Sequence, residues 1–143
     1  MLIVTVLRTK GDAVVTVPPS ATVRELLDTL AEHRIGAVVV SSGAGIAGIV
    51  SERDVVRRLR DAGAALLDQP VARIMTTEVV TCRRETPVDE LMTTMTERRI
   101  RHVPVVDERG AIVGIVSIGD LVKSRISELE SERDDLVGYI GTR

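Results

Sequence analysis

The chain has 143 residues, of which 44% are hydrophobic and 28% are charged, and its formal net charge is −2. This length fits one compact domain or two small halves that share a core. The near-neutral charge provides no large field for nucleic acid or a membrane surface. Tyr139 is the only aromatic residue, so there is no set of rings on which successive bases could stack. Cys82 is the only cysteine, which excludes a disulfide framework and a cysteine metal cluster.

Residues with catalytic chemistry are few. The only imidazoles are His33 and His102, and neither belongs to a pattern typical of a nucleophile or a metal site. We therefore expect no enzymatic activity, no metal and no catalytic cofactor. Because no secretory signal opens the chain and no apolar run is long enough to span a bilayer, we expect a cytoplasmic protein without a membrane partner.

The elements of the first half can be read in chain order. Residues 1–12 fit a strand or a short helix, and we favour a short helix packed on the body of the protein. Residues 13–17 form a β-rich run that two prolines stop. Apolar residues then recur at helical spacing from Val23 to Leu30, which predicts a helix with one apolar face.

Two further strands and a second helix follow. Residues 35–40 are apolar throughout, which predicts a strand buried on both faces. A turn at 41–47 leads to a third strand at 46–50, and a helix is predicted over 54–62, ended by Gly63. Three residues of this helix are expected to face the core: Val55, Val56 and Leu59.

The second half repeats this order. Val79 repeats Val14 at an offset of 65 residues, which holds up to Val105 and Val40, and Gly114 repeats Gly48 at an offset of 66. The change in length therefore falls in the hairpin turn between these positions. Two copies are too few for a solenoid. They predict a pseudo-twofold pair of β-α-β-β-α units, joined by a linker around residues 64–77.

Each copy places a serine and an aspartate three residues apart where a strand meets a helix. The pairs are Ser51 with Asp54, and Ser117 with Asp120. This spacing is typical of a capping box, which stabilises the first turn of a helix without any ligand. A hydroxyl and a carboxylate repeated at the same corner are also the best indication of a binding site.

The string Gly-Ile-Val-Ser-x-x-Asp at both corners, together with residues 102–107, resembles the CBS domain. Pairs of these domains, called Bateman modules, occur in IMP dehydrogenase and chloride channels, and the chain looks like the small stand-alone bacterial CBS-pair proteins. The resemblance implies an α/β fold of tandem CBS domains. We place the first domain at residues 8–67, the second at 75–132, and a C-terminal helix extension at 133–143.

The resemblance also implies the ligand. Asp54 and Asp120 would bind the ribose hydroxyls of an adenine nucleotide (AMP, ADP, ATP or NAD), and a carboxylate suits this role because it accepts two hydroxyl hydrogens at once. Ser51 and Ser117, at helix N-termini, would donate to phosphate or ribose. The remaining expected contacts are Val80, Thr81, Arg101, His102, Val103 and Pro104 in the second copy, and Val15, Thr16, Ile35, Ala37 and Val38 in the first.

The two sites are expected to be unequal. Arg101 and His102 precede a strand where the family often places basic residues on phosphates, although cations there also complement the dipole of the preceding helix. The first copy has Gly36 and Ala37 at these positions. Residues 43–48 match G-x-G-x-x-G, but because a strand follows, we interpret them as a hairpin turn.

The C-terminal segment, residues 121–140, is predicted to continue the last helix. Its partial apolar stripe, interrupted at Arg133, consists of Val122, Ile126, Leu129, Leu136 and Ile140. Such a helix needs to pack on its own body or on a partner chain, and we expect a homodimer. The sequence thus favours a non-catalytic nucleotide sensor of energy or redox state that acts on an effector protein; the alternative is a ligand-free dimeric scaffold whose corners serve only as caps.

Overall fold

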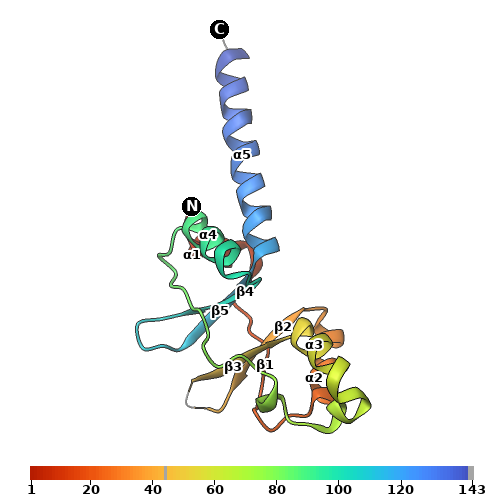
Figure 1. The fold of residues 1–143 in the computed structure, drawn as a ribbon. Coiled ribbons are helices and arrows are strands. Elements are labelled where there is room, and N and C mark those ends of the chain that lie inside the picture. The colour runs from red at the N-terminus through yellow and green to blue at the C-terminus, as the bar shows by residue number, and fades with distance from the viewer. Residues whose placement is uncertain (44, 142–143) are drawn as a thin grey trace.

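The computed structural model describes residues 1–43 and 45–141 and consists of two α/β halves with a long C-terminal helix (Figure 1). The elements of the first half are α1 (Ile3–Lys10), β1 (Thr16–Val17), α2 (Val23–His33), β2 (Ala37–Ser41), β3 (Ile46–Ser51) and α3 (Glu52–Ala62). Two 3-10 helices, η1 (Gly63–Asp68) and η2 (Val71–Arg73), lead to α4 (Val88–Arg98), β4 (His102–Val106), β5 (Ile112–Ser117) and α5 (Ile118–Gly141).

The sheet of the first half has the order β1-β2-β3, with β1 parallel to β2 and β3 antiparallel to it. The central strand is buried over 37–40, as its continuous apolar run predicts. The glycine motif of residues 43–48 leads into a strand, as expected, since β3 begins at Ile46 and includes Gly48; Ala44 lies outside the described residues. In α3, however, only Val55 is buried, whereas Val56 is 68% exposed and Leu59 is 45% exposed, so the prediction that both face the core is wrong.

The second half has only two paired strands, β4 and β5. The strand expected at residues 79–81 is absent, and the segment contributes one isolated parallel bridge, between Cys82 and Val105. Cys82 donates its N–H to the carbonyl of Pro104 and accepts from the N–H of Val106. The next bond of a parallel ladder would need an N–H from Pro104, which proline lacks, so the ladder stops there.

Each half is completed by the segment that precedes the other half. Ile3, Val6 and Leu7 of α1 belong to the core of the second half, which confirms a short helix packed on the body. Residues 63–75 fall largely within the linker predicted around residues 64–77, and they contribute to the core of the first half through η1 and η2. Matching bonds tie the two segments in place, since the Val71 N–H donates to Ala21 at 2.8 Å and the Ile3 N–H donates to Thr86 at 3.0 Å.

Two equivalent glycines lie where these completing segments meet the sheets. A Cβ on Gly48 would stand 2.7 Å from the carbonyl oxygen of Thr76, and one on Gly114 would stand 2.7 Å from Cδ2 of Leu7. Both distances are far below normal contact. Because glycine has no side chain, the completing segments can approach the sheets at these two positions.

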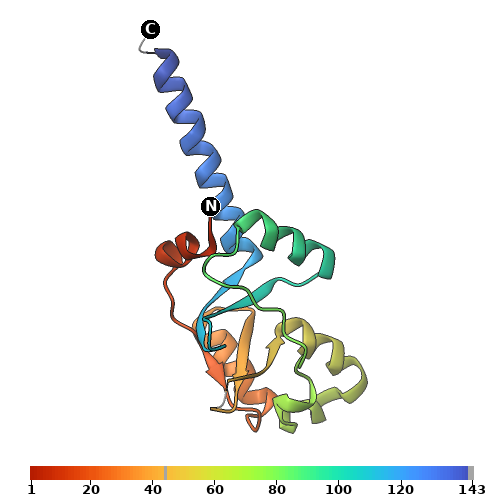
Figure 2. The ribbon, with the colours of Figure 1, turned by 90° about the vertical axis from the view of Figure 1, so that its left-hand side faces the viewer.

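Helix α5 continues the second half and projects away from the body (Figures 1 and 2). It is one helix of 24 residues, as the sequence predicts, and Leu121 is its only buried residue within the described range. From residue 129 onward every described residue is exposed. Among the described helices, none combines the length and the apolar character needed to cross a membrane.

Candidate functional site

Both serine–aspartate corners are formed as capping boxes. At the start of α3, Oδ2 of Asp54 accepts hydrogen bonds from the Ser51 N–H at 2.8 Å and from the Ser51 hydroxyl at 3.1 Å. At the start of α5, Oδ2 of Asp120 accepts from the Ser117 N–H at 2.8 Å, and the Asp120 N–H donates to Oγ of Ser117 at 3.1 Å. The cap uses one carboxylate oxygen in each copy, which leaves the other available for a ligand.

Lys10 occupies the corner at Asp120. Its ammonium donates to Oδ2 of Asp120 at 2.5 Å and to the carbonyl of Ile115 at 2.7 Å. Burial raises the pKa of Asp120, but the hydrogen bonds from Lys10 and Ser117 outweigh it, so the pKa lies below its usual value. The last turn of α1 thus neutralises the carboxylate that was expected to hold ribose.

The corner at Asp54 differs in this respect. The carbonyl of Ile49, which corresponds to that of Ile115, accepts the backbone N–H of Thr76 at 2.9 Å instead of a lysine. Within residues 1–43 and 45–141, no cationic side chain forms an ion pair with Asp54. The first corner therefore keeps an uncompensated carboxylate.

A cavity of about 830 Å³ opens at this corner, between the two halves. It is lined by residues 36–37, 49, 51–54, 56–57 and 76 from the first half and its exchanged segment, and by residues 78–80 and 98–102 that lead into the second half. The volume is in the range of small-molecule sites in proteins. Helix α3 thus presents its N-terminus to a space whose opposite wall comes from the other repeat.

Charged residues of both signs line the cavity, with the positive charges in excess. The cations are Arg53, Arg57, Arg98, Arg99 and Arg101, and the acids are Glu52, Asp54 and Glu78. Arginine matches phosphate oxygens because its planar guanidinium donates two parallel hydrogen bonds. The end of α4 places two of these arginines at the cavity. Arg98 is the last residue of the helix, and Arg99 takes the left-handed conformation (φ 56°) that ends it.

His102 lies between the two corners. It pairs with Ser117 across β4 and β5, and its Cε1 is 3.5 Å from the position that a Cβ on Gly36 would take. Its pKa is lowered, first by burial and then by the charges of Lys10 and Arg101, against the opposite effect of Asp120 and Glu52. At neutral pH the imidazole is therefore uncharged and can both donate and accept.

The structure regroups the residues predicted from sequence. Six of them line the cavity together: Ala37, Ser51, Asp54, Val80, Arg101 and His102. Arg101 and His102, which were expected beside Asp120, thus line a cavity with Asp54, while His102 also pairs with Ser117 at the corner of Asp120. Ser117 and Asp120 form the corner that Lys10 closes.

The other predicted residues do not line this cavity. Val38 and Val103 are fully buried in the two cores, and Pro104 is also buried. Val15 and Ile35 are half-buried against the first core, while Thr16 and Thr81 are exposed. Their role in ligand binding stays a prediction.

Several lining residues were missed or assigned otherwise from sequence. Glu78, Arg98 and Arg99 were not among the contacts expected from sequence. A sequence pattern does not indicate that the end of α4 faces α3 of the other repeat. The duplication was the one available signal, since it implies a twofold relation that brings such ends together.

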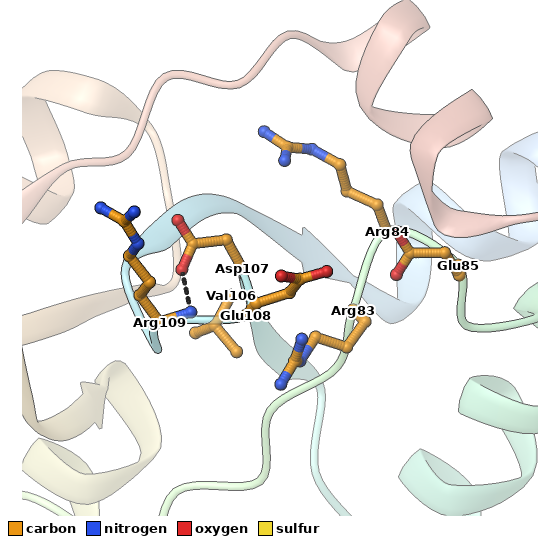
Figure 3. A pocket seen from close by; sticks show the side chains of 7 residues that line it. All are labelled: Arg83, Arg84, Glu85, Val106, Asp107, Glu108 and Arg109. Atoms are coloured by element: carbon orange, nitrogen blue, oxygen red, sulfur yellow. Dashed lines mark hydrogen bonds between the residues drawn. The ribbon is translucent and has the colours of Figure 1, made fainter.

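A smaller hollow of about 230 Å³ lies at the hairpin between β4 and β5 (Figure 3). Its walls are Arg83, Arg84, Glu85, Val106, Asp107, Glu108 and Arg109. The carboxylate of Asp107 accepts the backbone N–H groups of Arg109 at 2.8 Å and Ala111 at 2.9 Å, and the bond from Ala111 is the main cause of its lowered pKa. This acid closes a turn, and the hollow is not a second candidate site.

Two repeated α/β halves with a charged cavity between them define a paired ligand-binding module. A match to the CBS domain covers residues 9–61 and 71–127, and the chain belongs to this family. It is similar to a crystal structure of a CBS-domain protein from Agrobacterium tumefaciens, with 44% identity and a TM-score of 0.85, covering 87% of this chain and 99% of that one.

Two other relatives bear on function. A CBS-domain protein from Pyrobaculum aerophilum, solved in complex with AMP, is 32% identical with a TM-score of 0.79, covering 91% of this chain and 97% of that one. The mitochondrial CBS domain-containing protein CBSX3 of Arabidopsis thaliana is 37% identical over 124 residues, which cover 83% of this chain. The match spans 60% of the length of that relative.

Proposed function

We propose that this protein is a non-catalytic regulatory module that binds one adenine nucleotide in the cavity at Asp54. The observation that carries the proposal is the cavity of about 830 Å³, which joins the carboxylate of Asp54, a group with no ion pair within the described residues, with five arginines. The likeness to a protein solved in complex with AMP supports this class of ligand. The candidates are AMP, ADP, ATP and NAD.

The chemistry of the lining suits such a ligand. Oδ1 of Asp54 is not used by the cap, so it can accept hydroxyl hydrogens from a ribose while Oδ2 holds the start of α3. The arginines at the end of α4 and the start of α3 can neutralise phosphates. Val80 and Ile100 supply aliphatic surface for a base, in a protein with no phenylalanine or tryptophan.

Binding between the halves gives a route to regulation. A nucleotide that contacts both walls favours the relative position of the halves in which both sets of contacts form. An effector protein that distinguishes these positions would then respond to the energy or redox state of the cytoplasm. We expect the active unit to be a homodimer.

The ligand-free scaffold remains the second candidate. It is favoured by the capping boxes, because Asp54 and Asp120 both have a structural role without any ligand. Under this alternative, the two halves only hold α5 and the exposed surface of α3 in fixed positions.

Calorimetric titration with the four nucleotides separates the two candidates. We expect saturable binding of at least one nucleotide, and Asp54→Asn should weaken it about 10-fold or more because a charge-assisted hydrogen bond is lost. Asp120→Asn is the matched control, since it makes the same change at the corner that Lys10 closes, and it should leave the affinity nearly unchanged. Absence of binding by all four nucleotides would contradict the proposal and favour the scaffold.

A further inference from the structure

The imidazole of His102 lines the cavity and has no partner of its own. Within residues 1–43 and 45–141 its two nitrogens form no hydrogen bond or ion pair. No buried polar side-chain atom in that range lacks a partner, so these nitrogens are accessible to solvent. Cε1, the carbon between them, and Oε1 of Glu52 lie 3.5 Å and 3.4 Å from the same point, the position of a Cβ on Gly36. The ring therefore reaches from the second half to the first.

Four charged groups from four parts of the fold face this imidazole. Lys10 comes from the end of α1, Glu52 from the start of α3, Asp120 from α5, and Arg101 directly precedes the histidine. Two are cations and two are acids, so their effects largely cancel. Burial then has the largest effect and holds the pKa of His102 below its usual value. In the free protein the ring is uncharged at neutral pH.

An anionic ligand would change this balance. The five arginines of the cavity form no ion pair with another described residue, so a phosphate group is drawn to the space that the imidazole also lines. A negative charge within about 4–6 Å stabilises the protonated form of a histidine, typically by about one pKa unit or more. The protonated ring donates from both nitrogens, which suits phosphate oxygens.

We propose that His102 takes up a proton when a nucleotide binds in the cavity, so that the protein binds its ligand more tightly as the pH falls. This inference rests on the proposed function and concerns the regulation of the same site. The sign follows from linkage, because a complex that holds the proton more firmly than the free protein is favoured in acid. Ala37 stands at the equivalent position of the first copy, so the repeat supplies this group only once.

NMR spectroscopy of the full chain tests the inference directly. His33 and His102 are the only histidines, so two imidazole signals report the whole titration. We expect His102 to titrate below pH 6.5 in the free protein and about one pH unit or more higher with saturating AMP, ADP, ATP or NAD. His33 is exposed on α2 and does not line the cavity, so its signal should titrate at the same pH with and without the nucleotide.

Calorimetry in two buffers of different ionisation enthalpy measures the proton itself. At neutral pH the wild type should take up a fraction of a proton for each nucleotide bound, and the affinity should rise up to about 10-fold on acidification for each unit by which the pKa of His102 is raised. His102→Asn should lose this uptake, whereas the matched control His33→Asn should keep it. The terminal phosphate of a mononucleotide also titrates at about pH 6, and the comparison of these variants separates its proton from that of the imidazole.

The outcomes distinguish this inference from the proposed function. Binding that leaves the titration of His102 unchanged, or an uptake of protons that His102→Asn retains, would overturn the inference while the nucleotide site stands. Absence of binding by all four nucleotides would contradict the proposed function and the inference with it. Circular dichroism verifies that His102→Asn is folded, and the NMR titration of the wild type requires no variant.

Discussion

The contact between Lys10 and Asp120 gives the sharpest prediction. Lys10→Met keeps most of the aliphatic stem but removes the ammonium that donates to Oδ2 of Asp120 and to the carbonyl of Ile115. The two side chains of the ion pair are 32% and 27% exposed, so solvent screens the pair only in part. From the range for exposed ion pairs and for charge-assisted hydrogen bonds, we expect a loss of about 1 kcal/mol in the free energy of unfolding. For a chain of this length that corresponds to a fall of about 3 °C in Tm.

Urea denaturation of four proteins isolates the pair: wild type, Lys10→Met, Asp120→Asn and the double variant. The cost of Lys10→Met should be much smaller when Asp120 is already replaced. Arg8→Met, a change of the same kind at an exposed position in α1, is the control and should cost little. If Lys10→Met costs the same in both backgrounds, the ion pair does not contribute the stability that its geometry suggests, and the reasoning is refuted.

The same variant has an effect on pH dependence and on binding. Because the folded-state pKa of Asp120 is lowered, its contribution to stability is present above the ordinary value of 3.8 and is lost as the pH falls through the folded value. The difference between wild type and Lys10→Met should therefore be full at neutral pH and should shrink in strong acid to the part that the hydrogen bond from Lys10 to the Ile115 carbonyl contributes. Removing Lys10 also exposes the second carboxylate, so the calorimetric stoichiometry should rise from one nucleotide per chain toward two.

Three further predictions concern other positions. Gly48→Ala should lower the free energy of unfolding, measured by urea denaturation, by about 1–3 kcal/mol, because its Cβ would meet the backbone oxygen of Thr76. Gly114→Ala should lower it clearly less, because its Cβ would meet only the end of the Leu7 side chain. Equal losses would contradict the difference in contacts. Burial raises the pKa of the Cys82 thiol to about 12, so the native protein should resist a thiol reagent in mildly alkaline buffer and react fully once denatured. The lowered pKa of His102 means that the unfolded chain binds the proton more readily, so stability should fall as the pH drops below 6.5, and His102→Asn should flatten this slope.

Much of the fold was accessible from the sequence because local patterns and the repeat agreed. The buried run of β2, the helical spacing in α2 and the single long helix α5 were all predicted, and the structure confirms them. The family was recognised from the repeated corner, and the match to the CBS domain confirms it. Where the prediction of a strand failed, at residues 79–81, the reason was a proline on the neighbouring strand rather than any property of the segment itself.

The site was less predictable because it depends on how the two halves are arranged relative to each other. The sequence grouped Arg101 and His102 with the corner of their own copy, at Asp120, but the cavity joins Arg101 with Asp54 of the other copy. It also ranked the corner at Asp120 above the corner at Asp54, whereas Lys10 occupies the former. Lys10 lies 110 residues from its partner, and no periodicity or motif connects residues at that separation.

The exchange of completing segments makes the two repeats mutually dependent. Neither repeat would keep a complete core if it were expressed as a continuous segment alone, because α1 contributes to the core of the second half and residues 63–75 contribute to the core of the first half. Unfolding of either should expose apolar surface in both, so the chain is expected to melt in a single step.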